Sequence, residues 1–195
     1  VAADRDADVI EPARSSREPE LTGLESMRIS LEVYGAEAQF DAGLIGGYQF
    51  ANAALAVKAL ETLSGRGVVS IPGEAMRRGL MDVRRNAGIA GRLLPVEDNP
   101  EVVVDVAHNP DAVRSMLALW SRIRKPERTH LVFGMMKTKD LDAVLELIDE
   151  YPWAGIVAVM AKNGLGTDPK DIAAKAGFRG MKLDTSVSVP EGVKQ

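Results

Sequence analysis

The sequence predicts an α/β fold in which a mostly parallel sheet is layered with helices, preceded by a β-hairpin and helices of a second domain. Two patterns support this prediction. After residue 101, short apolar runs alternate with segments of helical periodicity, which is typical of successive β-α-β units. Earlier in the chain, one stretch alternates apolar and polar residues with the period of two that is typical of a hairpin. We expect residues 1–88 to belong to one domain and residues 89–195 to another.

The first domain is expected to contain a hairpin and two helices. The first twenty or so residues are polar and offer few candidates for a core, so we expect loops there. The apolar-polar alternation turns at Tyr34 and Gly35, which places a hairpin over residues 27–40. Spacing and end signals predict helices over residues 48–64 and 72–81, and a linker over residues 86–100.

The second domain is expected to be a βαβαβα unit. Its strands are apolar runs without alternation, which predicts burial on both faces. The last helix has Asp168 as its N-cap, Pro169 at its first position and Gly177 past its end. We expect strands over residues 102–106, 129–135 and 155–161, a weak strand within 182–189, and helices over 111–123 and 139–149.

Composition narrows the classes of function. The net charge of −4 gives no electrostatic reason to expect nucleic acid or an anionic membrane as a partner. No apolar run approaches the ~18 residues that a membrane-spanning helix needs. The chain has no cysteine, which excludes disulfides and thiolate metal sites and is compatible with a reducing compartment. A dehydrogenase is disfavoured because no G-x-G-x-x-G follows a strand.

A cluster of polar residues separates the first apolar run of the second domain from its helix. In VVVDVAHNP, the residues Asp105, His108 and Asn109 stand at the carboxyl end of a strand, where open α/β sheets bind ligands. One interpretation is structural, with Asp105 and Asn109 capping the next helix and His108 as a hydrogen-bonded residue. The other interpretation is a binding site. Composition alone leaves both open.

Four motifs extend this interpretation when they are taken together. They are GGYQFANAALA at residues 46–56, GR at 91–92, DVAHNP at 105–110 and VFGMMKTKDL at 132–141. Their order and spacing resemble the folylpolyglutamate and dihydrofolate synthases, members of the Mur ligase superfamily, over about residues 25–184. The resemblance implies that residues 89–195 form a Rossmann-like Mur ligase C-terminal domain. It also implies that residues 1–88 are the end of the central ATPase domain.

The resemblance implies an activity and a set of ligands. Enzymes of this family use ATP and Mg²⁺ to activate the carboxylate of folate or dihydropteroate as an acyl phosphate, which the amino group of L-glutamate attacks. In them, two domains hold the nucleotide and the reaction takes place in the cytoplasm. We expect the magnesium ligands and the catalytic residues in the rest of the ATPase domain, which is then a necessary partner of this chain.

The motifs also imply roles for four residues. By resemblance, Asn52 contacts the adenine, Arg92 reaches the phosphates, and Asp105 binds the ribose hydroxyls with His108 beside it. A guanidinium matches phosphate oxygens in a bidentate fork, and a carboxylate can accept bonds from two neighbouring hydroxyls. Structural alternatives are a solvated linker residue for Arg92 and a helix-start cap for Asn52. Three other charged residues of the fourth motif receive no role: Lys137, Lys139 and Asp140. For Lys139 and Asp140 the structural alternative is a pair of surface charges in the first turn of a helix.

The chain departs from the family pattern in three places. It has Tyr48 where a His is usual, and Ile89 and Ala90 where Trp-Pro is common. It also contains no G-x-x-x-x-G-K-[ST], the loop that cradles the β- and γ-phosphates. We therefore expect the isolated chain to be inactive as a ligase. We also expect the hairpin, without the rest of its sheet, to pack less well than residues 102–106.

Two other functions remain open at this point. The chain could be a non-catalytic Rossmann-like module that binds a nucleotide or a partner. It could also belong to a peptidoglycan Mur ligase, which shares the DxAHNP motif but fits the first and fourth motifs less well.

Overall fold

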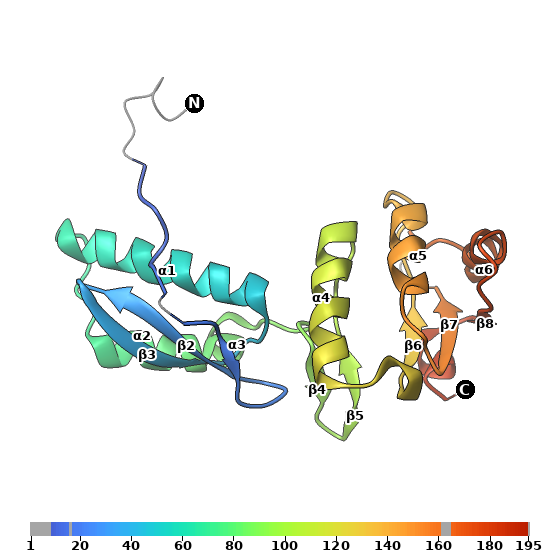
Figure 1. Ribbon diagram of the computed structural model, residues 1–195, viewed down its shortest axis with the longest axis horizontal. Helices are drawn as coiled ribbons and strands as arrows, with labels where there is room; N and C mark the ends of the chain where they lie inside the picture. The colour runs from blue at the N-terminus through green and yellow to red at the C-terminus, as the bar shows by residue number, and fades with distance from the viewer. Residues whose placement is uncertain (1–8, 16, 161–164, 195) are drawn as a thin grey trace. The chain divides into compact units, whose positions relative to one another are not determined.

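The computed structural model describes residues 9–15, 17–160 and 165–194. They form two compact units whose boundary lies between Val106 and Ala107. Each unit combines a sheet with helices (Figure 1), which confirms the α/β prediction. Within the described ranges, no helix is both long and apolar enough to cross a membrane. The loops expected at residues 1–8 lie outside the described residues.

An antiparallel sheet of three strands organises the first unit. The strands are β1 (Glu20–Leu21), β2 (Met27–Val33) and β3 (Ala36–Ala42), paired in sequence order. The β2–β3 hairpin confirms the predicted one, whereas β1 is too short to have been predicted. Its turn residues Tyr34 and Gly35 have φ values of 50° and 77°. Left-handed turn residues give the backbone twist that a two-residue hairpin connection needs.

Helices from the same unit cover the hairpin. α1 (Gly47–Gly65) packs against β2 and α2 (Gly73–Met81) packs against β3, while α3 (Val83–Ala87) follows α2 directly (Figure 1). The first two confirm predicted helices. The Arg77 guanidinium also lies over the Phe40 ring, 5.2 Å from its centroid. The buried apolar residues of this unit include Met27, Ile29, Leu31, Phe40, Ala42, Ile45, Ala54, Val57 and Met76.

The expectation that the hairpin packs less well than residues 102–106 is wrong. Leu31 is 0% and Ile29 is 1% exposed, whereas Val104 is 45% exposed. The reason is that α1 and α2 already supply a second layer over the hairpin. Burying a side chain of this size stabilises the fold by roughly 1.5–3 kcal/mol.

The region predicted as a linker contains a strand. β4 (Leu94–Val96) pairs antiparallel with β5 (Asn99–Val104), with an irregularity between Pro95 and Val96. β5 therefore lies in a two-stranded antiparallel sheet, and the expectation that it opens the parallel sheet is wrong. Burial on both faces is also wrong for this strand, because two short strands cannot cover each other's faces.

A parallel sheet organises the second unit. Its strands β6 (His130–Phe133), β7 (Gly155–Val159) and β8 (Asp184–Ser186) are neighbours in sequence order. They confirm three predicted strands, although residue 161 of the second lies outside the described residues. The helices α4 (Pro110–Ile123), α5 (Leu141–Asp149) and α6 (Pro169–Gly177) confirm the predicted ones, except that Gly177 is the last residue of α6 and does not lie past its end. Two short elements were missed: the 3₁₀ helix η2 (Pro126–Arg128) and α7 (Val189–Gly192).

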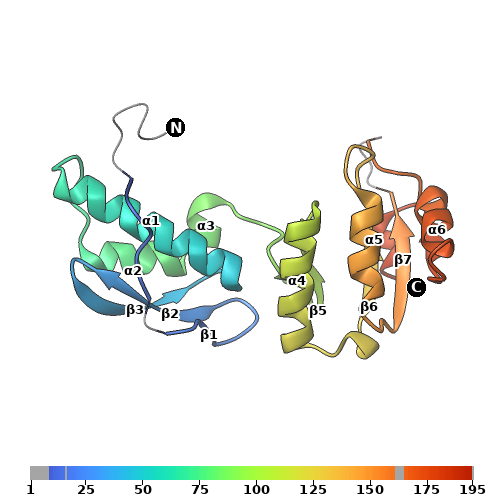
Figure 2. The same cartoon turned by 45° about the horizontal axis from the view of Figure 1, so that its top comes forward.

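Alternation along β7 places helices on both faces of this sheet. Figure 2 shows α4 and α5 side by side. Ala158 belongs to the apolar cluster formed with residues of α4, α5 and α6. Its neighbours Val157 and Val159 point the other way and meet α7, where a Cβ added to Gly192 would be 2.7 Å from Val159 Cγ1. The β7 strand is therefore covered on both faces, as its apolar sequence predicts.

The burial pattern predicts how backbone protection differs within the first unit. We expect the amides of residues 29–31 and 40 to exchange with solvent at least about tenfold more slowly than those of residues 102–104, because exchange follows local stability. Hydrogen exchange resolved by residue measures this directly. Equal protection of the two regions would contradict the layered packing of the hairpin.

Candidate functional site

Two predicted site residues, Arg92 and Asp105, meet at one turn. The Oδ2 atom of Asp105 accepts a hydrogen bond of 2.9 Å from the backbone N–H of Leu93, the residue after Arg92. The antiparallel pairing of β4 with β5 makes this approach possible, because Leu94 lies opposite Val104. A carboxylate and a guanidinium-bearing residue thirteen positions apart in the sequence are thereby held close together.

The turn of residues 91–93 has an unusual backbone. Gly91 has a φ of 65° and Leu93 has a φ of 47°. At Gly91 a side chain is also excluded by space, since an added Cβ would be 2.5 Å from Val106 Cγ1. A left-handed conformation costs a residue such as leucine roughly 1–2 kcal/mol. Leu93 is only 7% exposed, and its burial offsets a cost of that size.

Asp105 has a structural task that the sequence did not predict, because its Oδ2 accepts from the N–H of Leu93. The N-cap of α4 is Asn109, whose Oδ1 accepts from Ala112 N–H at 2.8 Å, which confirms the capping interpretation for that residue. The carboxylate of Asp105 holds the turn of residues 91–93. Each carboxylate oxygen can accept more than one hydrogen bond, so this task and ligand binding are chemically compatible.

Arg92 is fixed through its backbone. Its carbonyl oxygen accepts a hydrogen bond of 2.9 Å from Nη2 of Arg84. Its own side chain is half-buried, and within the described ranges we find no hydrogen bond or ion pair from its guanidinium. The geometry thus fixes the main chain of Arg92 and leaves the guanidinium available for a ligand.

Asn52 lies in the second turn of α1 and is exposed. The N-cap of α1 is Gly46, so the alternative of Asn52 as a helix-start cap is wrong. Arg84, which bonds to the carbonyl of Arg92 in the turn of residues 91–93, also donates from Nε to the carbonyl of Gly43 at 2.7 Å, shortly before α1. With about 1.5 Å of rise per residue, Asn52 stands roughly 8 Å along α1 from its start.

The remaining candidates belong to the second unit. His108 is exposed in the segment that precedes α4. Asp140 is the N-cap of α5 and accepts from Ala143 N–H at 3.1 Å, which gives it a structural role. Lys137 N–H donates to the carbonyl of Leu165 at 3.1 Å, and Lys139 N–H closes a turn on Met136.

Sequence reasoning missed Arg84. Met76, Leu80 and Arg84 are spaced four residues apart, the first two in α2 and the third in the separate helix α3. Met76 is 3% exposed, and the carbonyl of Leu80 accepts from Gly43 N–H at 3.0 Å. Leu80 and Arg84 both bond to Gly43, which directly follows the hairpin, so the two helices meet at this point.

The described residues contain no group of three or more His, Cys, Asp or Glu side chains that could hold a metal ion. We therefore assign none of them to magnesium. The turn of residues 91–93 instead brings together one arginine, Arg92, and one aspartate, Asp105.

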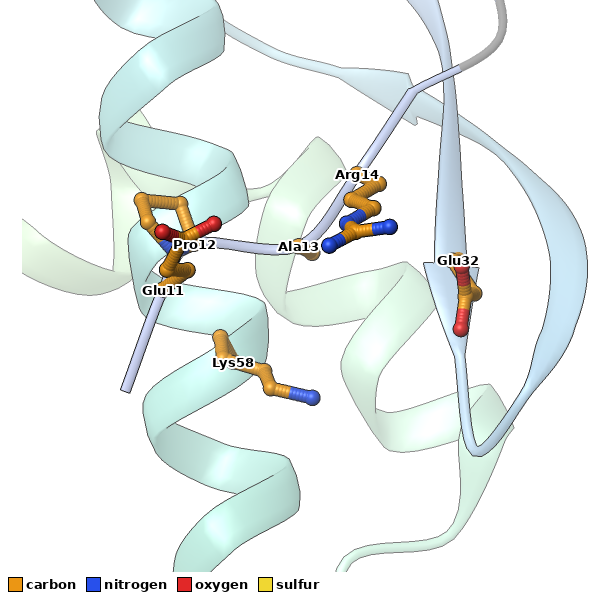
Figure 3. Close-up of a pocket in the computed structure, with 6 residues that line it drawn as sticks. All are labelled: Glu11, Pro12, Ala13, Arg14, Glu32 and Lys58. Carbon is orange, nitrogen blue, oxygen red and sulfur yellow. The ribbon is translucent and has the colours of Figure 1, made fainter. Parts of the chain in front are cut away.

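A separate hollow of about 230 Å³ lies between α1 and the edge of β2 (Figure 3). Arg14 and Lys58 point into it, with Glu11 and Glu32 among the other lining residues. Lys58 forms an ion pair of 2.9 Å with Glu61, so its charge is already balanced. None of the predicted site residues lines this hollow.

Comparison with known proteins identifies relatives of this chain. The chain is 34% identical over 131 residues to a probable bifunctional folylpolyglutamate synthase/dihydropteroate synthase of Haloferax volcanii, a match covering 67% of the chain and 14% of the relative. It is 32% identical over 106 residues to a dihydrofolate synthase/folylpolyglutamate synthase of Bacillus subtilis, covering 54% of the chain and 24% of the relative. The matches thus span a quarter or less of these relatives.

A solved structure has the same fold. The folylpolyglutamate synthase of Mycobacterium tuberculosis, complexed with ADP and AMPPCP, superposes with a TM-score of 0.84 at 21% identity, covering 99% of this chain and 43% of the other. This likeness shows a shared fold.

A family profile gives the assignment. The profile described as Mur ligase, glutamate ligase domain, matches residues 91–195, which is more than half of the chain. The resemblance that the four motifs indicated is confirmed by this match and by the names of the relatives. The chain therefore belongs to the Mur ligase family, through the glutamate ligase domain.

Proposed function

We propose that this chain is the C-terminal part of an ATP-dependent ligase that joins L-glutamate to folate or dihydropteroate through an acyl phosphate. In this proposal, residues 89–195 are the C-terminal domain and residues 1–88 are the end of the ATPase domain. The rest of the ATPase domain supplies the phosphate-binding loop and the magnesium ligands. We place the reaction in the cytoplasm, as the absence of cysteine allows.

One observation carries the nucleotide part of the proposal. Arg92 and Asp105 are held at one turn by the hydrogen bond from Leu93 N–H to Asp105 Oδ2. Their chemistry fits the two polar ends of a nucleotide, a guanidinium for the phosphates and a carboxylate for the ribose diol. Asn52 on α1 is the candidate for the adenine, and His108 is the candidate beside the ribose.

The names of the relatives support the substrate class. Both curated relatives are named as folylpolyglutamate synthases, and the solved structure with the same fold was determined with ADP and AMPPCP. Bound ATP supplies the phosphoryl group that activates a carboxylate. This chain's residues would bind and orient the nucleotide, a contribution that acts through positioning and charge.

The proposal predicts that this chain alone binds ATP through the part of the nucleotide site that it contains. On titration with ATP, we expect the backbone NMR signals of residues 91–93 and 105 to shift in a saturable way. Arg92→Ala should weaken the binding of ATP by roughly tenfold or more, because it removes charge-assisted hydrogen bonds. Arg85→Ala is the matched control, since Arg85 is exposed and pairs only with Asp82 among the described residues. Equal ATP affinity in the Arg92 and Arg85 variants would argue against the site.

Two substitutions separate the structural and ligand tasks of Asp105. Asp105→Ala should cost roughly 1–3 kcal/mol of folding stability, because it leaves the N–H of buried Leu93 without its acceptor. It should also lower the affinity for ATP. Asp105→Asn retains an oxygen acceptor but loses the charge. We therefore expect this variant to have near-normal thermal stability and a lower affinity for ATP. Thermal melts and ATP titrations measure the two effects. Normal ATP affinity in both variants would leave Asp105 with its structural task alone.

The proposal also predicts that the isolated chain does not turn over. With ATP, L-glutamate and either folate or dihydropteroate, we expect no glutamate-dependent release of ADP, because the sequence contains no phosphate-binding P-loop. A longer protein that includes the remainder of an ATPase domain should show this activity. Glutamate-dependent ADP release by the chain alone would overturn the proposal that the rest of the ATPase domain supplies the phosphate-binding loop and the magnesium ligands.

A further inference from the structure

Arg84 is a half-buried arginine that joins two separate parts of the first unit. It lies in the short helix α3, and its Nε donates to the carbonyl of Gly43 at 2.7 Å. Its Nη2 donates to the carbonyl of Arg92 at 2.9 Å. Its third nitrogen, Nη1, is buried and has no hydrogen-bond partner among the described residues. Burial lowers the pKa of Arg84, and the charge of Glu25 raises it.

One end of this connection is a fixed point. Gly43 directly follows β3, and its N–H donates to the carbonyl of Leu80 in α2 at 3.0 Å. A Cβ added to Gly43 would be 2.1 Å from the carbonyl oxygen of Met81, so hairpin and helix are in close contact here. Arg84 is therefore anchored on a junction between a packed sheet and a helix.

The other end is the turn that carries Arg92. Each residue of this turn is held by one hydrogen bond from a different source. Gly91 O accepts from Val106 N–H at 2.9 Å, Arg92 O accepts from Arg84, and Leu93 N–H donates to Asp105. Because Leu93 is left-handed and is not a glycine, its backbone would relax toward commoner conformations without such restraints.

We propose that Arg84 is a positioning residue for Arg92, which it holds in the orientation that meets the phosphates of the nucleotide. This inference rests on the proposed function of Arg92. A guanidinium can reach two carbonyls with two of its nitrogens in a rigid plane, whereas the single ammonium of lysine cannot reproduce that geometry. The nearby Arg85 makes none of these contacts and instead pairs with Asp82 on an exposed surface.

The test measures the hydrogen exchange of the turn and the affinity for ATP in the same set of variants. Variants are Arg84→Ala, Arg84→Lys, Arg92→Ala, the double variant Arg84→Ala/Arg92→Ala, and Arg85→Ala as the control. Hydrogen exchange reports on the amides of Leu93 and Val106, with Ile29 and Phe40 as reference positions in the hairpin. ATP titrations give the dissociation constant of each variant.

In Arg84→Ala we expect the Leu93 and Val106 amides to exchange about tenfold faster while those of Ile29 and Phe40 change little. ATP should bind about tenfold more weakly, and Arg84→Lys should restore only part of either effect. The double variant should bind ATP no more weakly than Arg92→Ala alone, since a residue that acts through Arg92 has no effect once Arg92 is gone.

Three outcomes would overturn the inference. The first is unchanged exchange at Leu93 and Val106, which would show that Arg84 does not hold the turn. The second is an equal rise in exchange at the hairpin positions, which would show a general loss of stability. The third is an additive loss of ATP affinity in the double variant. If Arg92→Ala itself leaves ATP affinity unchanged, the proposed function fails and the nucleotide role of Arg84 fails with it, while the exchange data still decide whether Arg84 holds the turn.

Discussion

The hydrogen bond between Leu93 N–H and Asp105 Oδ2 is the constraint on which the candidate site depends. It closes a turn with two left-handed residues and sets the point at which β4 begins to pair with β5. Without it, the N–H of a buried leucine would lack its acceptor, a loss of roughly 1–3 kcal/mol. A side chain expected to serve a ligand thus also holds the backbone that carries its neighbour in the site, Arg92.

The first unit gives this turn a rigid support. The hairpin is buried by α1 and α2, and the junction of β3 with α2 admits only glycine at position 43. Arg84 extends that rigidity to Arg92 with two hydrogen bonds from one planar group. Interactions that fix the backbone of a charged residue before the ligand arrives reduce the entropy lost on binding, which is the physical advantage of such a turn.

Much of the fold could be predicted from sequence because its signals are local. Helical spacing, the Asp168 and Pro169 start of α6 and the alternation of β2 each specify an element within a few residues. The pairing of β4 with β5 was missed although it is local, with only Glu97 and Asp98 between the paired Val96 and Asn99, because this Gly- and Pro-containing segment resembles a linker. The site followed the same division. Motifs identified Arg92 and Asp105, but the role of Arg84 depends on contacts with residues 41 positions before it and eight after it.

The most direct measurement follows the side-chain Nε–Hε NMR signals of Arg84 and Arg92 while the chain is titrated with ATP and, separately, with adenosine. If Arg92 meets phosphates from a turn that Arg84 holds, the Arg92 signal moves with ATP and stays in place with adenosine. The Arg84 signal then remains slow to exchange throughout, because its Nε–H stays bonded to the carbonyl of Gly43. An Arg92 signal whose chemical shift does not change with ATP, or changes equally with adenosine, would contradict the proposed phosphate contact.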